Sequence, residues 1–287
     1  MGAIYRRELK SYFTNMIAYI FIAFLLVVVG IFFTYYNLKQ GAPQLEYALY
    51  GVMFIFLVTV PLLTMRSIAS EKYDRTEQLL YSLPLNMKSI VMGKFLAMFT
   101  VFAIPMALIC FYPFILSIYG SVNFIGTYSS ILAYILLGAA LISIGMFISS
   151  LTESQVIAAV VGLGALLLIY LMPDLSALIP TTEIVSYVCF AVLIALFAVV
   201  LYSMTKNSGV ACIAGAVLEA GLLVLFLFKK DIFASAFPDM LKKIALFERF
   251  TEFVNGTFDL TGIIYYVSVI FVFIFLTVQS LEKKRYS

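Results

Sequence analysis

Few side chains in this sequence are of types that could carry out chemistry, and one of them stands alone in a long apolar stretch. Glu219 is the single formal charge within the eight apolar segments described below. An ionisable group at that depth indicates either a functional site, such as an ion-coupling site, or a protonated acid that hydrogen-bonds a neighbouring helix. Lys206 is thirteen residues away, about 20 Å along a helix, and is no direct partner. Both interpretations of Glu219 stay open.

Catalytic and metal-binding chemistry is limited by what the 287 residues lack. There is no histidine, which removes histidine-based acid–base catalysis, Ser-His and Cys-His nucleophiles and imidazole metal sites. The three cysteines, Cys110, Cys189 and Cys212, each lie in an apolar run, where a free cysteine behaves as a small buried hydrophobe. We therefore expect no catalytic residue, no metal site and no directly bound cofactor.

A nucleotide-binding loop is also missing. Gly93-Lys94 resembles the end of a phosphate loop, but Lys88 and Phe95 occupy positions where G-x-x-x-x-G-K-[ST] requires glycine and a hydroxyl residue. If the protein uses ATP, the ATPase must be another chain. A net charge of +3, from basic residues scattered between apolar blocks, does not indicate a nucleic-acid binder.

The composition indicates an integral membrane protein. The chain is 64% hydrophobic and 11% charged, whereas soluble domains carry about 25% charged residues. A membrane-crossing helix needs about 20 mainly apolar residues. The stretches that meet or approach this length are 16–36, 48–65, 95–119, 128–150, 156–172, 185–204, 209–228 and 262–281. We therefore expect an all-α polytopic membrane protein with about eight transmembrane helices.

The basic residues of the short loops predict the orientation. An even number of spans places both termini on one side, which holds twelve lysines and arginines. The first three loops of the other side hold one, Lys39, and the 229–261 loop raises that count to six. Because lysine and arginine are enriched on the inner side, we expect both termini in the cytoplasm.

Residues 3–15 predict an amphipathic helix in the cytoplasmic interface, with a plain juxtamembrane tail as the alternative. Its apolar and basic residues fall on opposite faces, and the chain then enters the first span, which we interpret as an uncleaved anchor. The apolar positions are Tyr5, Leu9, Tyr12 and Met16, and the basic positions are Arg6, Arg7 and Lys10.

The 66–94 segment is the only sizeable loop expected in the cytoplasm. It combines helix-capping and helix-ending residues with a short apolar face. The capping and ending residues are Asp74, Thr76, Glu77 and Pro84, and the apolar face is Leu79, Leu80 and Leu83. Such a loop indicates a docking element for a soluble partner, and a solvated hairpin without a partner is the alternative.

The 229–261 segment is expected outside the membrane. Apolar residues keep helical spacing there, and Pro238 and Asn255-Gly256 divide the segment into one or two short helices. Such helices rest on the outer interface or cap a lateral opening between spans. Packing and direct substrate contact both stay open as their role.

Three stretches together resemble permease subunits of type 2 ABC exporters, most closely the gliding-motility-type ABC permease. They are RRELKSYFTNMIAYIF, SEKYDRTEQLLYSLPLNMKSIVMGKFLA and FERFTEFVNGTFDLTGIIYYVSVIFVFIFLTVQSLEKKR. The residues on the family's coupling-helix pattern are Glu71, Thr76, Glu77, Leu79, Leu80, Pro84, Gly93 and Lys94, and Leu83 lies in the same stretch. Those on its external segment are Phe247, Glu248, Phe250, Phe253, Gly256, Asp259 and Leu260.

The resemblance implies a domain organisation. Residues 1–15 would form an interfacial elbow helix, and residues 16–287 a single transmembrane permease domain. The family normally has six spans, so the chain would be a six-span core with an extra hairpin at 184–228. The 66–94 segment would then be the cytoplasmic coupling hairpin.

The resemblance also implies partners. Two permeases, identical or different, would each dock on an ABC ATPase that holds ATP and Mg, in the bacterial cytoplasmic membrane. Some members of the family also work with an auxiliary membrane-anchored subunit. Lipids, glycans, peptides and drugs are substrates of this broad class. Two alternatives from other classes are an ion-coupled carrier that uses Glu219 and a membrane scaffold.

Overall fold

The chain is almost entirely helical in the computed structural model, which describes residues 1–76, 86–205, 208–228 and 230–286. It divides into two compact units, Met1–Ile169 with Leu246–Ser287 (unit 1) and Tyr170–Ala245 (unit 2). Within the described residues, six helices are long and apolar enough to cross a membrane. The prediction of an all-α polytopic membrane protein is confirmed.

Six predicted spans correspond to these long helices, and the other two correspond to shorter apolar helices. The six are Ile17–Lys39, Leu45–Tyr73, Met87–Ile118, Phe124–Leu151, Gln155–Leu178 and Leu260–Lys283. The helices at the predicted extra hairpin contain the apolar segments Glu183–Val199 and Cys212–Phe228.

The first three spans are built from consecutive shorter helices, preceded by α1 (Gly2–Thr14). The first consists of α2 (Ile17–Phe33) and a π-helical turn, Thr34–Lys39. The second consists of α3 (Leu45–Val52), a 3₁₀ turn, α4 (Phe56–Thr64) and α5 (Ala69–Tyr73), and the third of α7 (Met87–Ile109) and α8 (Tyr112–Tyr119). Pro61 and Pro105 lie inside α4 and α7. Proline has no backbone N–H, so each removes one hydrogen bond from its helix.

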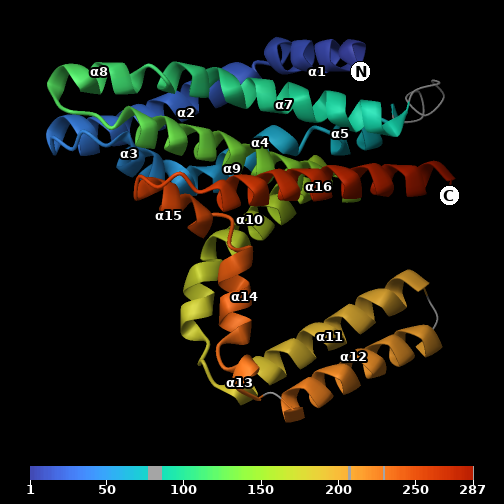
Figure 1. Cartoon of the computed structure of the whole chain (residues 1–287). Coiled ribbons are helices and arrows are strands. Elements are labelled where there is room, and N and C mark those ends of the chain that lie inside the picture. Colours follow the sequence, from blue (N-terminus) through green and yellow to red (C-terminus); the bar gives the residue numbers. More distant parts are fainter. Residues whose placement is uncertain (77–85, 206–207, 229, 287) are drawn as a thin grey trace. The chain divides into compact units, whose positions relative to one another are not determined.

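The core of unit 1 is α9 (Phe124–Leu151), which is 78% buried over its most apolar window. The corresponding windows of α10 (Gln155–Leu178) and α16 (Leu260–Tyr286) are 17% and 22% buried. Figure 1 shows α9 between α4 and α16, and α7 also packs against it. The outer helices therefore present apolar faces to lipid or to other chains.

Small residues on α9 let its neighbours approach closely. A Cβ atom at Gly138 would lie 2.4 Å from the ring of Phe102 on α7, and one at Gly145 would lie 2.4 Å from Oγ1 of Thr64 on α4. Lipid chains are as apolar as leucine, so helix association in a membrane depends on such close packing and on interhelical polar contacts. The two glycines therefore set the distances from α9 to α7 and to α4.

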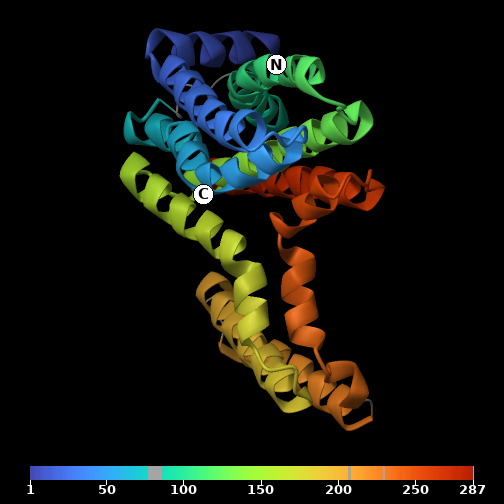
Figure 2. The same cartoon turned by 90° about the vertical axis from the view of Figure 1, so that its left-hand side faces the viewer.

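Unit 2 contains the end of α10, α11 (Glu183–Thr205), α12 (Ser208–Phe228), α13 (Lys230–Phe233) and α14 (Ala236–Ile244). Figure 2 shows α11 and α12 side by side, and their contact includes the rings of Tyr187 and Phe226, 4.8 Å apart. The segment is divided just before Pro238, between α13 and α14, and Pro238 lies in the first turn of α14, where a missing N–H costs little. The predicted break at Asn255-Gly256 is confirmed, since both residues follow α15 (Glu248–Val254).

Gly145→Ala is expected to destabilise the protein. The added methyl must displace Thr64, and overpacking of this kind costs about 1–3 kcal/mol. Gly164→Ala on α10 is the matched control, because its Cβ meets nothing within 4 Å and alanine gains up to about 1 kcal/mol in helix propensity. Thermal unfolding of the detergent-solubilised variants should show opposite shifts, and equal shifts would contradict the close approach of α4 to α9.

Candidate functional site at the root of the predicted coupling hairpin

The predicted amphipathic helix over residues 3–15 is α1, which lies against α7. The Tyr5 hydroxyl is 3.1 Å from Oγ1 of Thr100, and the Tyr12 hydroxyl donates to the Leu63 carbonyl at 3.1 Å. Burial, followed by the charge of Glu8, raises the pKa of Tyr12, so its hydroxyl remains a donor. Part of the apolar face of α1 is thus used for packing on protein.

Of the other residues in the predicted elbow helix, some contact protein and some are exposed. Leu9 is half-buried, whereas Arg6, Lys10 and Met16 are exposed. Arg7 points toward the hairpin and belongs to the cluster of charges described next. The predicted opposition of apolar and basic faces therefore holds for Arg6 and Lys10 but not for Arg7.

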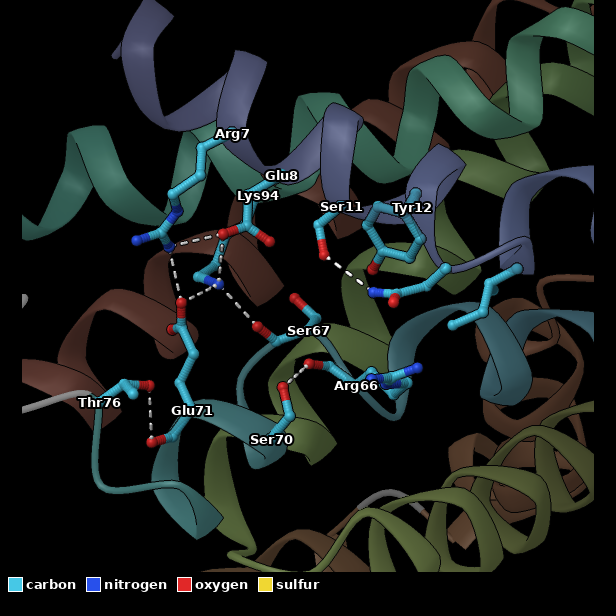
Figure 3. A pocket seen from close by; sticks show the side chains of 12 residues that line it. Arg7, Glu8, Ser11, Tyr12, Arg66, Ser67, Ser70, Glu71, Thr76 and Lys94 are labelled. Carbon is cyan, nitrogen blue, oxygen red and sulfur yellow. Dashed lines mark hydrogen bonds and ion pairs between the residues drawn. The ribbon is translucent and has the colours of Figure 1, made fainter.

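Four charged residues from three helices meet beside α1 (Figure 3), and we call them the ion cluster: Arg7, Glu8, Glu71 and Lys94. Oε1 of Glu71 lies 2.8 Å from Arg7 Nη2 and 2.9 Å from Lys94 Nζ. Oε1 of Glu8 lies 2.7 Å from Arg7 Nη2 and 3.2 Å from Lys94 Nζ. Each carboxylate therefore contacts both cations.

Burial within the ion cluster increases from Arg7 to Lys94. The Arg7 side chain is 54% exposed, Glu8 13%, Glu71 17% and Lys94 2%. Lys94 Nζ also donates to the Ser67 carbonyl at 2.8 Å, so the ammonium faces one acceptor for each of its three protons. Partial burial lowers the pKa of Arg7, but hydrogen bonds and charges from Glu8 and Glu71 outweigh this and raise it.

A second set of contacts joins α5 to the end of α9. Ser149 Oγ accepts hydrogen bonds from the backbone N–H groups of Ile68 and Ala69, at 3.2 and 3.1 Å. These N–H groups start α5 and have no partner within the helix. The buried Lys72 ammonium donates to the Ser150 carbonyl. The first turn of the hairpin is therefore bonded to α1, α7 and α9.

The structure describes only part of the predicted coupling hairpin. Glu71 belongs to the ion cluster, and Thr76 donates from Oγ1 to the Glu71 carbonyl at 3.3 Å. The other predicted coupling residues, Glu77, Leu79, Leu80, Leu83 and Pro84, lie outside the described residues.

Sequence reasoning missed three residues at this site: Glu8, Lys72 and Ser149. One usable signal was Lys94, a cation just inside an apolar run, because a buried lysine requires a partner. The spacing of residues in the sequence does not indicate its two carboxylate partners or the contact of Ser149 with α5.

A family model described as "ABC-2 family transporter protein" matches residues 3–187, more than half of the chain. The chain belongs to the ABC-2 transporter family. Its members are multi-pass membrane permeases without a catalytic ATPase domain, and they act with ATPase subunits. No curated protein and no solved structure was found to match the chain. The matched region of this permease includes the whole ion cluster and ends within the first residues of α11.

The predicted external residues lie near the other end of α9 in this permease. Phe247 and Phe250 are buried, and the Phe250 ring is 5.8 Å from that of Tyr134 on α9. Ser130 donates to the Phe253 carbonyl at 2.9 Å, and Ser130 is nineteen residues from Ser149, about 28 Å along a helix. The external segment and the ion cluster are therefore separate sites.

Two predicted external residues carry carboxylates, and they differ in their partners. Asp259 accepts from the N–H groups of Thr261 and Gly262, both at 2.9 Å, and so caps the start of α16. In contrast, Oε2 of Glu248 is buried and has no hydrogen-bond partner within the described residues.

Glu219 lies on α12 in unit 2 and is half-buried. Among the residues that the structure describes, no hydrogen bond or ion pair involves its side chain. Within the same ranges there is no group of three or more His, Cys, Asp or Glu residues that could hold a metal ion. No described contact therefore supports either interpretation of Glu219.

Lys94→Met is expected to lower the free energy of unfolding by about 2–3 kcal/mol, because it leaves Glu8 and Glu71 half-buried beside each other. Arg7→Gln removes an exposed member and should cost less than about 1 kcal/mol. Adding Glu8→Gln and Glu71→Gln to Lys94→Met should recover part of the loss. Chemical unfolding in detergent measures these values, and equal costs for Lys94→Met and Arg7→Gln would refute the buried role of Lys94.

Asp259→Ala is expected to cost about 1 kcal/mol through loss of the helix cap, and Asp259→Asn should cost less, since asparagine also caps. Slight burial raises the pKa of Asp259, but hydrogen bonds from Thr261 and Gly262 outweigh it and lower the pKa. The stability that the ionised Asp259 contributes is thus present above the unfolded pKa, about 3.9, and is lost as pH falls through the folded pKa. Unfolding at pH 7 and pH 3 should show a smaller Asp–Asn difference at pH 3 than at pH 7.

Proposed function

We propose that this permease is the transmembrane subunit of an ABC exporter that couples ATP hydrolysis by a separate ATPase to substrate movement. The observation that carries the proposal is the bonding of α5 to three helices. Glu71 contacts Lys94 of α7 and Arg7 of α1, and the adjacent Lys72 bonds α9. A displacement of the hairpin by a docked ATPase would therefore act on all three helices.

The orientation that we propose places the hairpin in the cytosol, where the ATPase binds ATP and Mg. The positive bias of the loops supports this orientation. Figure 1 shows the two chain ends at the same end of unit 1 as α5 and the start of α7. The basic residues near both termini therefore share a side with Arg66, Lys72 and Lys88.

We propose a dimeric permease in the bacterial cytoplasmic membrane. The low burial of α10 and α16 supports it, since these helices leave apolar faces for a second copy or for lipid. Unit 2 contains the predicted extra hairpin, and the family match ends at its start. An auxiliary membrane-anchored subunit is therefore best sought at unit 2.

Deletion of residues 76–83, or Glu77→Lys, is expected to abolish co-purification of the ATPase encoded beside the permease. The reason is that this segment carries the predicted docking face. Glu252→Lys is the matched control, because it reverses an exposed charge on the external segment. A detergent pull-down from cells that express both proteins measures binding, and thermal unfolding checks that each variant is folded. Retention of the ATPase by the folded deletion variant would sink the proposal.

A further inference from the structure

A cavity of about 310 Å³ lies beside the ion cluster (Figure 3). Except for Ile17, the residues that line it have polar or charged side chains, and they include both carboxylates of the cluster. The cations that line it are Arg7, Arg66 and Lys94. The cavity lies where the first span begins and where the apolar part of the second span ends, which is the depth of lipid headgroups.

An apolar groove of about 310 Å³ runs between α2 and α4. The residues contributed by α2 follow the spacing of one helical face, and those of α4 and the residue after it lie opposite. The lining is Ile17, Ile20, Phe21 and Phe24 together with Val58, Thr59, Leu62, Leu63 and Met65. Ile20 is 69% exposed and Leu62 49%, so no described residue of unit 1 covers this groove.

The polar cavity and the apolar groove are adjacent. Ile17 lines both, and the consecutive residues Met65 and Arg66 line one each. The hydroxyl of Tyr12 in the cavity donates to the carbonyl of Leu63 in the groove. The cavity therefore offers a polar end, and the neighbouring groove an apolar end, to a ligand that contacts both.

The charge of the polar end favours an anion. The ion cluster contains two cations and two carboxylates and sums to zero. Arg66 adds a third cation, and its guanidinium makes no ion pair within the described ranges. A guanidinium donates two parallel hydrogen bonds to a phosphate, which makes it the residue best suited to such a ligand.

We propose that this site binds an anionic glycerophospholipid, with its phosphate at Arg66 and one acyl chain in the groove. An apolar helix of a second copy would fill the groove but would leave Arg66 without an anion, whereas a phospholipid satisfies both ends. Bound lipid would join α1, α2 and α4 beside the ion cluster. The proposal is independent of ATPase docking.

The test is native mass spectrometry of the full-length permease. The protein is first placed in nanodiscs of equimolar phosphatidylglycerol and phosphatidylcholine with distinguishable masses, and the lipids that it retains are then counted. Wild-type protein should retain phosphatidylglycerol over phosphatidylcholine. Arg66→Gln should lower that retention at least tenfold, since it removes the charge-assisted hydrogen bonds to the phosphate.

Two further variants separate the site from general effects. Val58→Trp fills the groove and should reduce the retention of both lipids, whereas Val27→Trp adds the same bulk on an exposed part of α2 outside it. Lys10→Gln removes an exposed cation of α1 that does not line the cavity, and it is the control for Arg66→Gln. Both control variants should retain lipid as the wild type does.

Several results would overturn the proposal. Equal losses in Arg66→Gln and Lys10→Gln would indicate general charge attraction. Retention of phosphatidylcholine as strong as that of phosphatidylglycerol would contradict the preference for an anionic lipid, since both lipids carry a phosphate. Displacement by glycerol 3-phosphate from the wild-type protein would indicate a soluble phosphate. A disulfide between copies from Leu62→Cys would place a second permease on the groove. The glycerol 3-phosphate and lipid-preference arms use wild-type protein and stand even if a variant does not fold.

Discussion

The burial of Lys94 is the interaction on which the arrangement of α1, α5 and α7 depends. Removing an ammonium from water costs several kcal/mol unless acceptors replace the water, and only 2% of this side chain is exposed. Its three acceptors come from three segments: Glu8 on α1, Glu71 on α5 and the Ser67 carbonyl between α4 and α5. Satisfying one cation therefore brings three separate segments to one point, and Arg7 at the rim balances the second carboxylate.

Apolar helices associate only weakly in a membrane, so the arrangement of the helices depends on a few specific contacts. Lipid chains solvate leucine faces as well as other helices do, so packing of small residues and interhelical hydrogen bonds decide which helices stay together. On α9 the small residues Gly138 and Gly145 admit α7 and α4. Its serines bond neighbours near both ends, Ser130 to the Phe253 carbonyl and Ser149 to the start of α5. α9 therefore links two distant sites through one continuous helix.

The sequence predicts the spans well because length and apolarity are local properties. The expected 128–150 and the observed Phe124–Leu151 differ by only a few residues. The second span extends to Tyr73, beyond the expected residue 65, because Ser149 and Ser150 supply partners for the polar start of α5. The ion cluster could not be predicted, since Glu8 and Glu71 are 63 residues apart and meet only once α1 lies against α7. The ion cluster depends on tertiary contacts, which the periodicity of the sequence does not indicate.

The two adjacent charges of α5 bond it to different neighbours. Glu71 and Lys72 are consecutive in a helix, so their side chains diverge by about 100° around its axis. Glu71 contacts Arg7 and Lys94, while Lys72 bonds the Ser150 carbonyl at the end of α9. Rotation of α5 about its own axis would break one set of contacts, and translation away from the bundle would break both. The displacement that preserves both sets carries α1, α7 and the end of α9 together with α5, which is the motion that the proposed coupling role requires.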